Sequence, residues 1–206
     1  MTESGFLELK SKTFRLLTEK LNPNLTYHSP SHTEDVLNQA ERIAALENIK
    51  DLHALMLIRI AALFHDTGFI RTYKGHEEQS CLILRDMLGP GELSEEDFLT
   101  TRGMIMATKL PQRPVTMSEK IICDADLDYL GRSDFIETSE LLKQEFLTYG
   151  VVKDELDWDR LQVSFFENHQ YFTETSRKER CPVKKQHHAF LIRKLKEREL
   201  KHNKLL

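Results

Sequence analysis

Residues 51–68 read DLHALMLIRIAALFHDTG, and this stretch decides the fold. Residues 55–64 are apolar except for Arg59, and an adjacent His65 and Asp66 follow them. A helix that is apolar on most faces is normally buried. An imidazole and a carboxylate at its end are costly in an apolar interior unless a partner pairs with both. A divalent metal ion is one such partner. The simpler alternative is a hydrogen bond between the two side chains that closes the helix.

Composition narrows the class of protein. The chain has 206 residues, enough for one well-buried core or at most two small ones, and its net charge of -4 does not suggest a basic surface for nucleic acid. The three cysteines (Cys81, Cys123 and Cys181) are widely spaced, which is typical of reduced intracellular thiols. The first residues, MTESGFLELK, contain no signal-peptide core, and no membrane-spanning run is evident. We expect a cytoplasmic protein without membrane contact.

Apolar residues recur at helical spacing along the whole chain, and no stretch alternates strongly enough to be a strand. We therefore expect an all-α fold: a single compact bundle of about eight to nine helices spanning residues 1–206. Its core would cover about 25–170, and a helical extension about 171–206. The expected helices span about 6–21, 33–47 (capped by Ser31 or Thr33), 51–67, 76–88, 94–108, 117–130, 134–149 (capped by Ser133 or Asp134), 154–171 and a last segment from 175 that Pro182 interrupts. The charged last segment packs on the body, forms a homodimer with a second subunit, or stays in solvent.

Two further stretches offer partners for the His-Asp pair. The first, YHSPSHTEDV at residues 27–36, contains His28 and His32. If Ser31 caps the helix, His32 lies in its first turn and His28 lies just outside it. Taken singly, each histidine is more often a surface residue at the start of a helix.

The second stretch, IICDADLD at residues 121–128, has carboxylates at every second position. Residues two apart on a helix face different directions, so the three carboxylates cannot all face solvent while the apolar residues face the core. At least one should point inward, where it needs a cation. A metal ion shared with the His-Asp pair would be that cation.

Together, in this order, these elements resemble the HD superfamily of metal-dependent phosphohydrolases. AALFHDTG resembles the small apolar run that enters the superfamily's His-Asp pair, and YHSPSHTEDV is similar to a stretch of its cyclic nucleotide phosphodiesterases. DADLDYLG with SDFIETSELLKQEF, and ENHQYFTETSRKERCPVKKQH, are similar to segments of a group of predicted bacterial HD phosphohydrolases. The resemblance covers roughly residues 25–190, and it implies an HD-domain-like helical bundle.

The resemblance also implies roles for individual residues. One divalent metal ion (Mn, Fe, Ni, Co, Zn or Mg) would be bound, and Asp66 would also serve in catalysis. His28 matches a general acid, and His76 would assist at a second metal or at phosphate. Two-metal members carry further histidines where this chain reads ATK at 107–109, which favours a single ion. The implied metal ligands are His32, His65, Asp66 and Asp126, with Asp124 as the alternative last ligand.

The implied function is hydrolysis of a phosphate ester of a nucleotide or related small phosphorylated metabolite by a metal-activated water. Lys109 and Arg132 are the first candidates to contact the phosphate, because they flank the helix that carries the carboxylates. Arg113, Arg177 and Lys178 are weaker candidates. Two alternatives remain: a catalytically weak or inactive, metal-containing nucleotide-binding regulatory module, and a purely helical interaction protein. The last would bind no metal and leaves the inward carboxylates unexplained.

Overall fold

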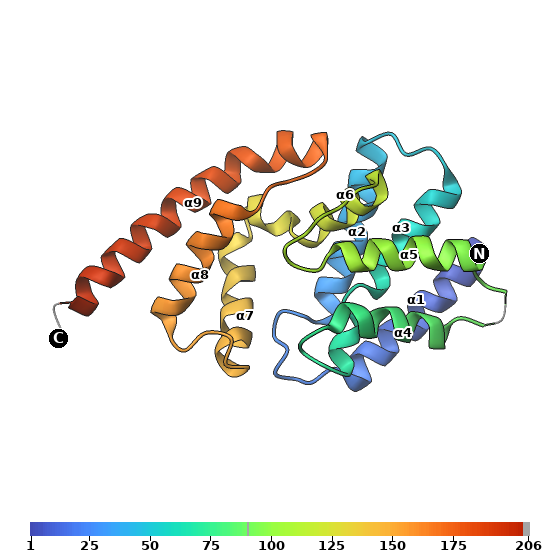
Figure 1. Ribbon diagram of the computed structural model, residues 1–206, viewed down its shortest axis with the longest axis horizontal. Helices are drawn as coiled ribbons and strands as arrows, with labels where there is room; N and C mark the ends of the chain where they lie inside the picture. The colour runs from blue at the N-terminus through green and yellow to red at the C-terminus, as the bar shows by residue number, and fades with distance from the viewer. Residues whose placement is uncertain (90, 204–206) are drawn as a thin grey trace.

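The computed structural model describes residues 1–89 and 91–203. Within these residues every regular element is helical, which confirms the expected all-α fold (Figure 1). The elements in chain order are α1 (Glu3–Lys20), α2 (Pro30–Leu46), α3 (Leu52–Phe64), the 3-10 helix η1 (Thr67–Ile70), α4 (His76–Met87), α5 (Glu95–Ala107), α6 (Met117–Asp126), the 3-10 helix η2 (Asp128–Gly131), α7 (Phe135–Thr148), α8 (Glu155–Asn168) and α9 (Glu174–Asn203).

Helix α3 is the centre of the main apolar core and packs against α1, α2, α4, α5 and α6. Residues 60–64 are completely buried, as the apolar run predicted. The one charged residue in that run, Arg59, forms ion pairs with Glu3 of α1 at 2.6 Å and Glu41 of α2 at 2.7 Å. These pairs keep the guanidinium at the edge of the core while its helix stays buried.

A second apolar cluster joins η2, α7, α8 and α9 to the loop before α2. Figure 1 shows α7, α8 and α9 on the side of the molecule away from α1, α4 and α5, with α9 running beside α8. The members of this cluster are Tyr27, Leu127, Tyr129, Leu130, Phe135, Phe166, Tyr171 and Leu191. The metal-ligand candidates on α2, α3 and α6 therefore lie near the boundary between the two apolar clusters.

Some helix ends differ from the sequence expectation. Ser29, not Ser31 or Thr33, caps α2, because Pro30 occupies the first helical position, where its missing N–H costs nothing. The stretch predicted as one helix over 117–130 divides into α6 and η2 at Leu127. Asp134 precedes α7 as predicted, but its side chain caps no backbone group. It pairs with Arg132 instead.

Helix α9 continues through Pro182, where an interruption was expected. An interior proline removes one backbone hydrogen bond, so contacts on both sides must hold the helix together. On one side, Arg180 binds Asp128 at 2.9 Å. On the other, Lys184 Nζ donates to the carbonyls of Phe166 at 3.0 Å and His169 at 2.6 Å. Both sides of the proline are thus anchored to neighbouring elements.

One segment of the described chain, Leu52–Ile70, has the length and hydropathy of a membrane-crossing helix. It contains α3 and η1, and 67% of its most apolar window is buried inside the protein. Its apolar composition is accounted for by its place at the centre of the core.

Candidate metal centre

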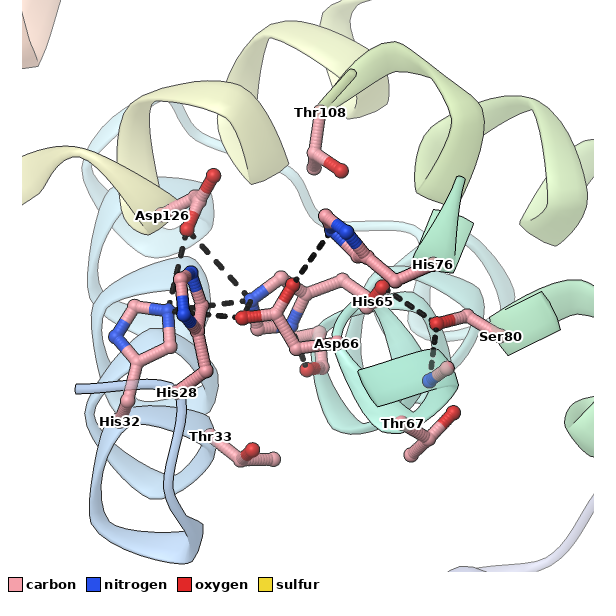
Figure 2. A network of polar contacts seen from close by, with 12 residues as sticks. His28, His32, Thr33, His65, Asp66, Thr67, His76, Ser80, Thr108 and Asp126 are labelled. Atoms are coloured by element: carbon pink, nitrogen blue, oxygen red, sulfur yellow. Dashed lines mark hydrogen bonds and ion pairs between the residues drawn. The ribbon is translucent and has the colours of Figure 1, made fainter. Parts of the chain in front are cut away.

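Four side chains from three segments of the chain meet at one point. His32 lies in the first turn of α2, His65 and Asp66 directly follow α3, and Asp126 is the last residue of α6. One ligand atom from each residue lies within 4.8 Å of all the others (Figure 2). These are the four residues that the resemblance implied as ligands, and we call them the four-residue cluster.

In the four-residue cluster, imidazole nitrogens lie close to carboxylate oxygens. His32 Nε2 lies 3.4 Å from Asp66 Oδ2 and 3.3 Å from Asp126 Oδ1. His65 Nε2 lies 3.2 Å from the same Asp66 oxygen and 3.6 Å from the same Asp126 oxygen. The two Nε2 atoms are 3.4 Å apart. All four atoms therefore point into one small volume.

The donor set fits a divalent metal ion. His65 Nδ1 lies 2.8 Å from the carbonyl oxygen of Ala62. A proton held on Nδ1 by that carbonyl leaves the Nε2 lone pair free, which is how metal-binding histidines are usually oriented. Asp66 Oδ2 is buried without a hydrogen-bond partner among the described residues. A cation between the two imidazoles and two carboxylates would satisfy that oxygen.

The charges in the four-residue cluster depend on one another. Burial lowers the pKa of His65, but the nearby Asp66 and Asp126 carboxylates outweigh burial and hold this pKa well above its usual value. Burial likewise raises the pKa of Asp66, but His65 and His32 hold it well below its usual value. Each carboxylate thus needs positive charge beside it. Protons on the histidines supply that charge, and a metal ion would replace them.

Asp124, the alternative last ligand, lies elsewhere. Its carboxylate is completely buried and accepts the backbone N–H groups of Phe172 and Thr173, each at 2.8 Å, and the Thr173 hydroxyl at 2.7 Å. These bonds hold the segment that leads into α9. The structure therefore does not bring Asp124 to the four-residue cluster, because backbone donors occupy its oxygens.

The third carboxylate of the IICDADLD stretch, Asp128, is also completely buried. Arg42 and Arg180 reach the same Asp128 oxygen at 3.1 and 2.9 Å. We expected at least one of the three carboxylates to point inward, and all three do. Each finds a different partner, and only Asp126 faces the histidines.

His76 at the start of α4 approaches the other oxygen of Asp66, with Nε2 3.4 Å from Oδ1. A close contact between η1 and α4 makes this possible, because a Cβ on Gly68 would lie 1.8 Å from the carbonyl oxygen of His76. Ser80 secures the same contact: its hydroxyl donates to the His65 carbonyl at 2.7 Å and accepts the Gly68 N–H at 2.8 Å. Figure 2 shows His76 directed at Asp66, and its sequence-based role at a second metal or at phosphate stays a prediction.

His28 lies beside the four-residue cluster, and a residue from the second half of the chain orients its ring. Its Nδ1 is 2.5 Å from Oε1 of Glu145 on α7, and Tyr73 donates its hydroxyl to the same oxygen at 3.0 Å. The His28 ring stacks on Phe69, whose other neighbour in the stack is His76, with centroid distances of 4.0 and 3.9 Å. Sequence reasoning missed Glu145 altogether.

A pocket of about 420 Å³ opens beside the four-residue cluster, and His28, Asp66, His76 and Asp126 form part of its wall. Lys109 also lines this pocket, and its Nζ lies 2.5 Å from Glu78. The pocket therefore gives a small molecule access to the residues with candidate roles.

The other cations named from the sequence lie elsewhere. Arg132 is not among the residues that line the pocket, because its guanidinium pairs with Asp35 at 2.8 Å and Asp134 at 2.7 Å. The expectation that Arg132 contacts the phosphate is therefore not supported by its position. Arg113, Arg177 and Lys178 do not line the pocket either.

Two imidazoles and two carboxylates that converge in a buried centre form a donor set that can hold a divalent metal ion. The family model of the HD domain matches residues 31–128, a range that contains the whole four-residue cluster. The chain therefore contains an HD domain, and HD domains are generally metal-dependent hydrolases. No curated protein and no solved structure matches the chain. The similarity to cyclic nucleotide phosphodiesterases stays a prediction.

Proposed function

We propose that this protein is a divalent-metal-dependent phosphohydrolase that cleaves a phosphate ester of a small molecule. The observation that carries the proposal is the four-residue cluster, whose ligand atoms converge within 4.8 Å beside the pocket. His32, His65, Asp66 and Asp126 would hold the ion. A divalent ion bound there would lower the pKa of a coordinated water and neutralise charge on the phosphate.

The chain's own residues would position the ester and move protons. His28 lines the pocket, and Glu145 occupies its Nδ1, so Nε2 is the nitrogen that can serve a ligand. An imidazolium at this place can give a proton to the ester oxygen as the P–O bond breaks, while the oxygen of a water molecule forms the new bond to phosphorus and the proton that this water loses passes to solvent. Lys109 would contact the phosphate from the rim, and His76 would hold Asp66 in place.

The side chains present support a single metal ion. The four-residue cluster supplies donors for one ion, and the segment that carries further histidines in two-metal members reads ATK at 107–109. His76 and Asp66 Oδ1 form a further pair that a second ion could use, and His76 alone could contact a phosphate oxygen. We propose a single-ion enzyme whose substrate is a monoester or diester.

A nucleotide is the substrate class that the resemblance implies, and a cytoplasmic location fits such a substrate. The second candidate function is a regulatory module that binds metal and nucleotide without turnover. The observation that favours the hydrolase is His28, because a sensor has no need of a histidine fixed beside the metal ligands by a buried carboxylate.

The test is turnover of p-nitrophenyl phosphate and bis-p-nitrophenyl phosphate by metal-stripped protein after addition of Mn, Fe, Co, Ni, Zn or Mg. We expect activity with at least one metal, and none with the stripped protein or with His65→Ala. Metal binding without turnover of either ester, or of nucleoside monophosphates and cyclic nucleotides, would instead support the regulatory module.

A further inference from the structure

The pocket continues well beyond the residues that would perform hydrolysis. Past the four-residue cluster it runs between η2, α7 and α8, all of which lie almost entirely outside the range matched by the HD family model. We call this second portion the distal pocket. The hydrolysis proposed above gives it no role. Its lining residues are Leu127, Tyr129, Leu130, Phe135, Leu142, Phe146, Trp158, Leu161, Gln162, Phe165 and Phe166.

A row of aromatic rings leads from the four-residue cluster into the distal pocket. The Tyr27 ring lies 4.5 Å from that of His32 and 5.6 Å from that of Tyr129. Phe135 follows at 6.3 Å from Tyr129, and Phe166 at 5.2 Å from Phe135. On α7 and α8, Phe146 and Trp158 meet edge to face at 5.7 Å. These contacts fix the rings in place, so the apolar wall is preformed.

The distal pocket carries no charged side chain. Of the residues that line it, Tyr129, Trp158 and Gln162 are the ones with polar side-chain atoms. A ligand group rich in hydroxyls or amides would leave several of its own polar atoms without partners there. A hydrocarbon group has no polar atoms to leave without partners there and would gain the burial of its apolar surface.

The charges at the metal end limit the number of phosphate groups. Two ammonium groups line the pocket, on Lys74 and Lys109, and Lys109 already pairs with Glu78. The lining residues include no arginine, and Glu77 adds a carboxylate to those of the four-residue cluster. A triphosphate needs several cationic partners. One divalent ion with these lysines matches a single phosphate group instead.

We propose that the substrate is a monophosphate ester with a hydrocarbon group, alkyl or aryl, which binds in the distal pocket between α7 and α8. This inference rests on the proposed phosphohydrolase function, since it assigns the substrate class of the same site. The helices that follow the HD domain thereby determine specificity, while the HD domain supplies the metal ligands. A nucleotide, with its polar sugar and base, fits the distal pocket poorly.

Chain length is the variable that tests this assignment. Each methylene that moves from water into an apolar site improves binding by up to about fourfold. Alkylphosphonates keep the phosphate-like head, and their P–C bond resists hydrolysis, so binding can be measured without turnover. We expect octylphosphonate to bind the Mn-loaded full-length protein at least about 100-fold more tightly than methylphosphonate in calorimetric titrations below the aggregation concentration of the ligand.

Two neighbouring leucines on α7 give a matched pair of variants. Leu142 lines the distal pocket, whereas Leu141 is 44% exposed and does not. Leu142→Asn should reduce the preference for octylphosphonate by about tenfold or more, and Leu141→Asn should leave it as in the wild type. Circular dichroism and melting temperature check that both variants fold. An equal preference in wild type and Leu142→Asn, or no preference in the wild type, would overturn the inference, as would tighter binding of adenosine monophosphate than of octylphosphonate.

Turnover is measured separately, on ethyl, butyl and octyl phosphate with the same Mn-loaded protein. Hydrolysis of all three at equal kcat/KM would contradict the inference that the distal pocket binds the hydrocarbon group, and would leave the proposed function supported. Octylphosphonate binding without hydrolysis of any phosphate ester would contradict the proposed function. It would still support the apolar preference of the distal pocket. A rise in kcat/KM with chain length supports both.

Discussion

Glu145 Oε1 on α7 lies 2.5 Å from Nδ1 of His28, a residue 117 positions earlier in the chain. The other oxygen of the same carboxylate accepts the backbone N–H groups of Tyr27 and His28, at 3.0 and 3.1 Å. The carboxylate is completely buried, so these bonds hold both the ring and the backbone of His28. The part of the chain that follows the HD match thus orients a residue at the candidate metal centre.

The first prediction concerns this pair. Glu145→Gln should lower kcat about 10- to 100-fold, because an amide has one acceptor oxygen and cannot serve both the His28 ring and the backbone N–H groups that the two carboxylate oxygens accept. His28→Ala should lower kcat by about 100-fold or more, as expected for loss of a general acid. If Glu145 acts through His28, the double variant should be no slower than His28→Ala alone. Multiplied effects in that double-mutant cycle, measured on p-nitrophenyl phosphate, would show that Glu145 acts independently.

The second prediction is the pH dependence of stability. Burial raises the pKa of Glu145, but the bonds to His28 outweigh it and lower this pKa below its ordinary value of 4.5. A carboxyl whose pKa is lower in the folded state stabilises the protein above its unfolded-state pKa, and this contribution disappears as the pH falls through the folded-state pKa.

Wild type should therefore exceed Glu145→Gln in free energy of unfolding by about 2 kcal/mol near neutral pH. The gap should shrink once the pH drops below about 4.5. Urea unfolding of both proteins between pH 3 and pH 7 measures it. If the difference in free energy of unfolding between the two proteins stays constant over that range, the ionised state of the Glu145 carboxylate does not stabilise the fold.

The third prediction separates two carboxylates that are two residues apart. Asp126→Ala should weaken metal binding by at least about 100-fold, because it removes a proposed ligand. Asp124→Ala should keep the metal and lower the free energy of unfolding by about 2–3 kcal/mol, because two buried backbone N–H groups lose their acceptor. Metal content after dialysis and urea unfolding give the two readouts. Retention of a full metal equivalent in Asp126→Ala, with loss in Asp124→Ala, would reverse the assignment.

The sequence predicted much of this arrangement, for identifiable reasons. The long apolar run of α3 could only be buried, and its His65-Asp66 ending needed partners that the flanking motifs supplied. Glu145 could not be found in the same way, because SELLKQEFL reads as an ordinary amphipathic helix and its contact with His28 is non-local. The arginines that pair with Asp128 come from α2 and α9. The local sequence pattern around Asp128 does not reveal these pairings either.

Other differences came from tertiary packing that overrides a local rule. Pro182 is a helix breaker in isolation, yet the anchored side chains of Arg180 and Lys184 keep α9 continuous. Arg132 lies next to the candidate site in the sequence, but acidic neighbours from α2 and its own loop bind its guanidinium. In each case one deciding partner lies far along the chain: Asp128 is 52 positions from Arg180, and Asp35 is 97 positions from Arg132.

The fourth prediction concerns the contact between η1 and α4. Gly68→Ala should lower the free energy of unfolding by about 3 kcal/mol, because the new Cβ would collide with the His76 backbone. Gly103→Ala is the matched control: on α5 its Cβ would meet nothing closer than Glu119 Oε1 at 3.5 Å. That change should raise stability by up to about 1 kcal/mol through helix propensity. Equal effects of the two substitutions in thermal unfolding would contradict the close contact.

The fifth prediction distinguishes two basic residues. Lys109→Ala should raise KM for a phosphate ester about tenfold with little change in melting temperature, because Lys109 lines the pocket and is half exposed. Arg132→Ala should leave KM unchanged and lower the melting temperature by a few degrees, because it breaks the ion pairs of Arg132 with Asp35, Asp128 and Asp134, which lie away from the pocket. A larger KM effect for Arg132→Ala would place the phosphate elsewhere.

The most direct measurement is metal content and turnover in the same samples of wild type and Asp66→Ala. Both proteins are stripped, reloaded with Mn and dialysed, and each is then assayed on p-nitrophenyl phosphate. We predict one metal equivalent with turnover for wild type, and neither for Asp66→Ala, whose buried carboxylate faces both histidines and His76. Equal metal content and equal turnover in the two proteins would contradict the assignment of the four-residue cluster as the catalytic metal centre.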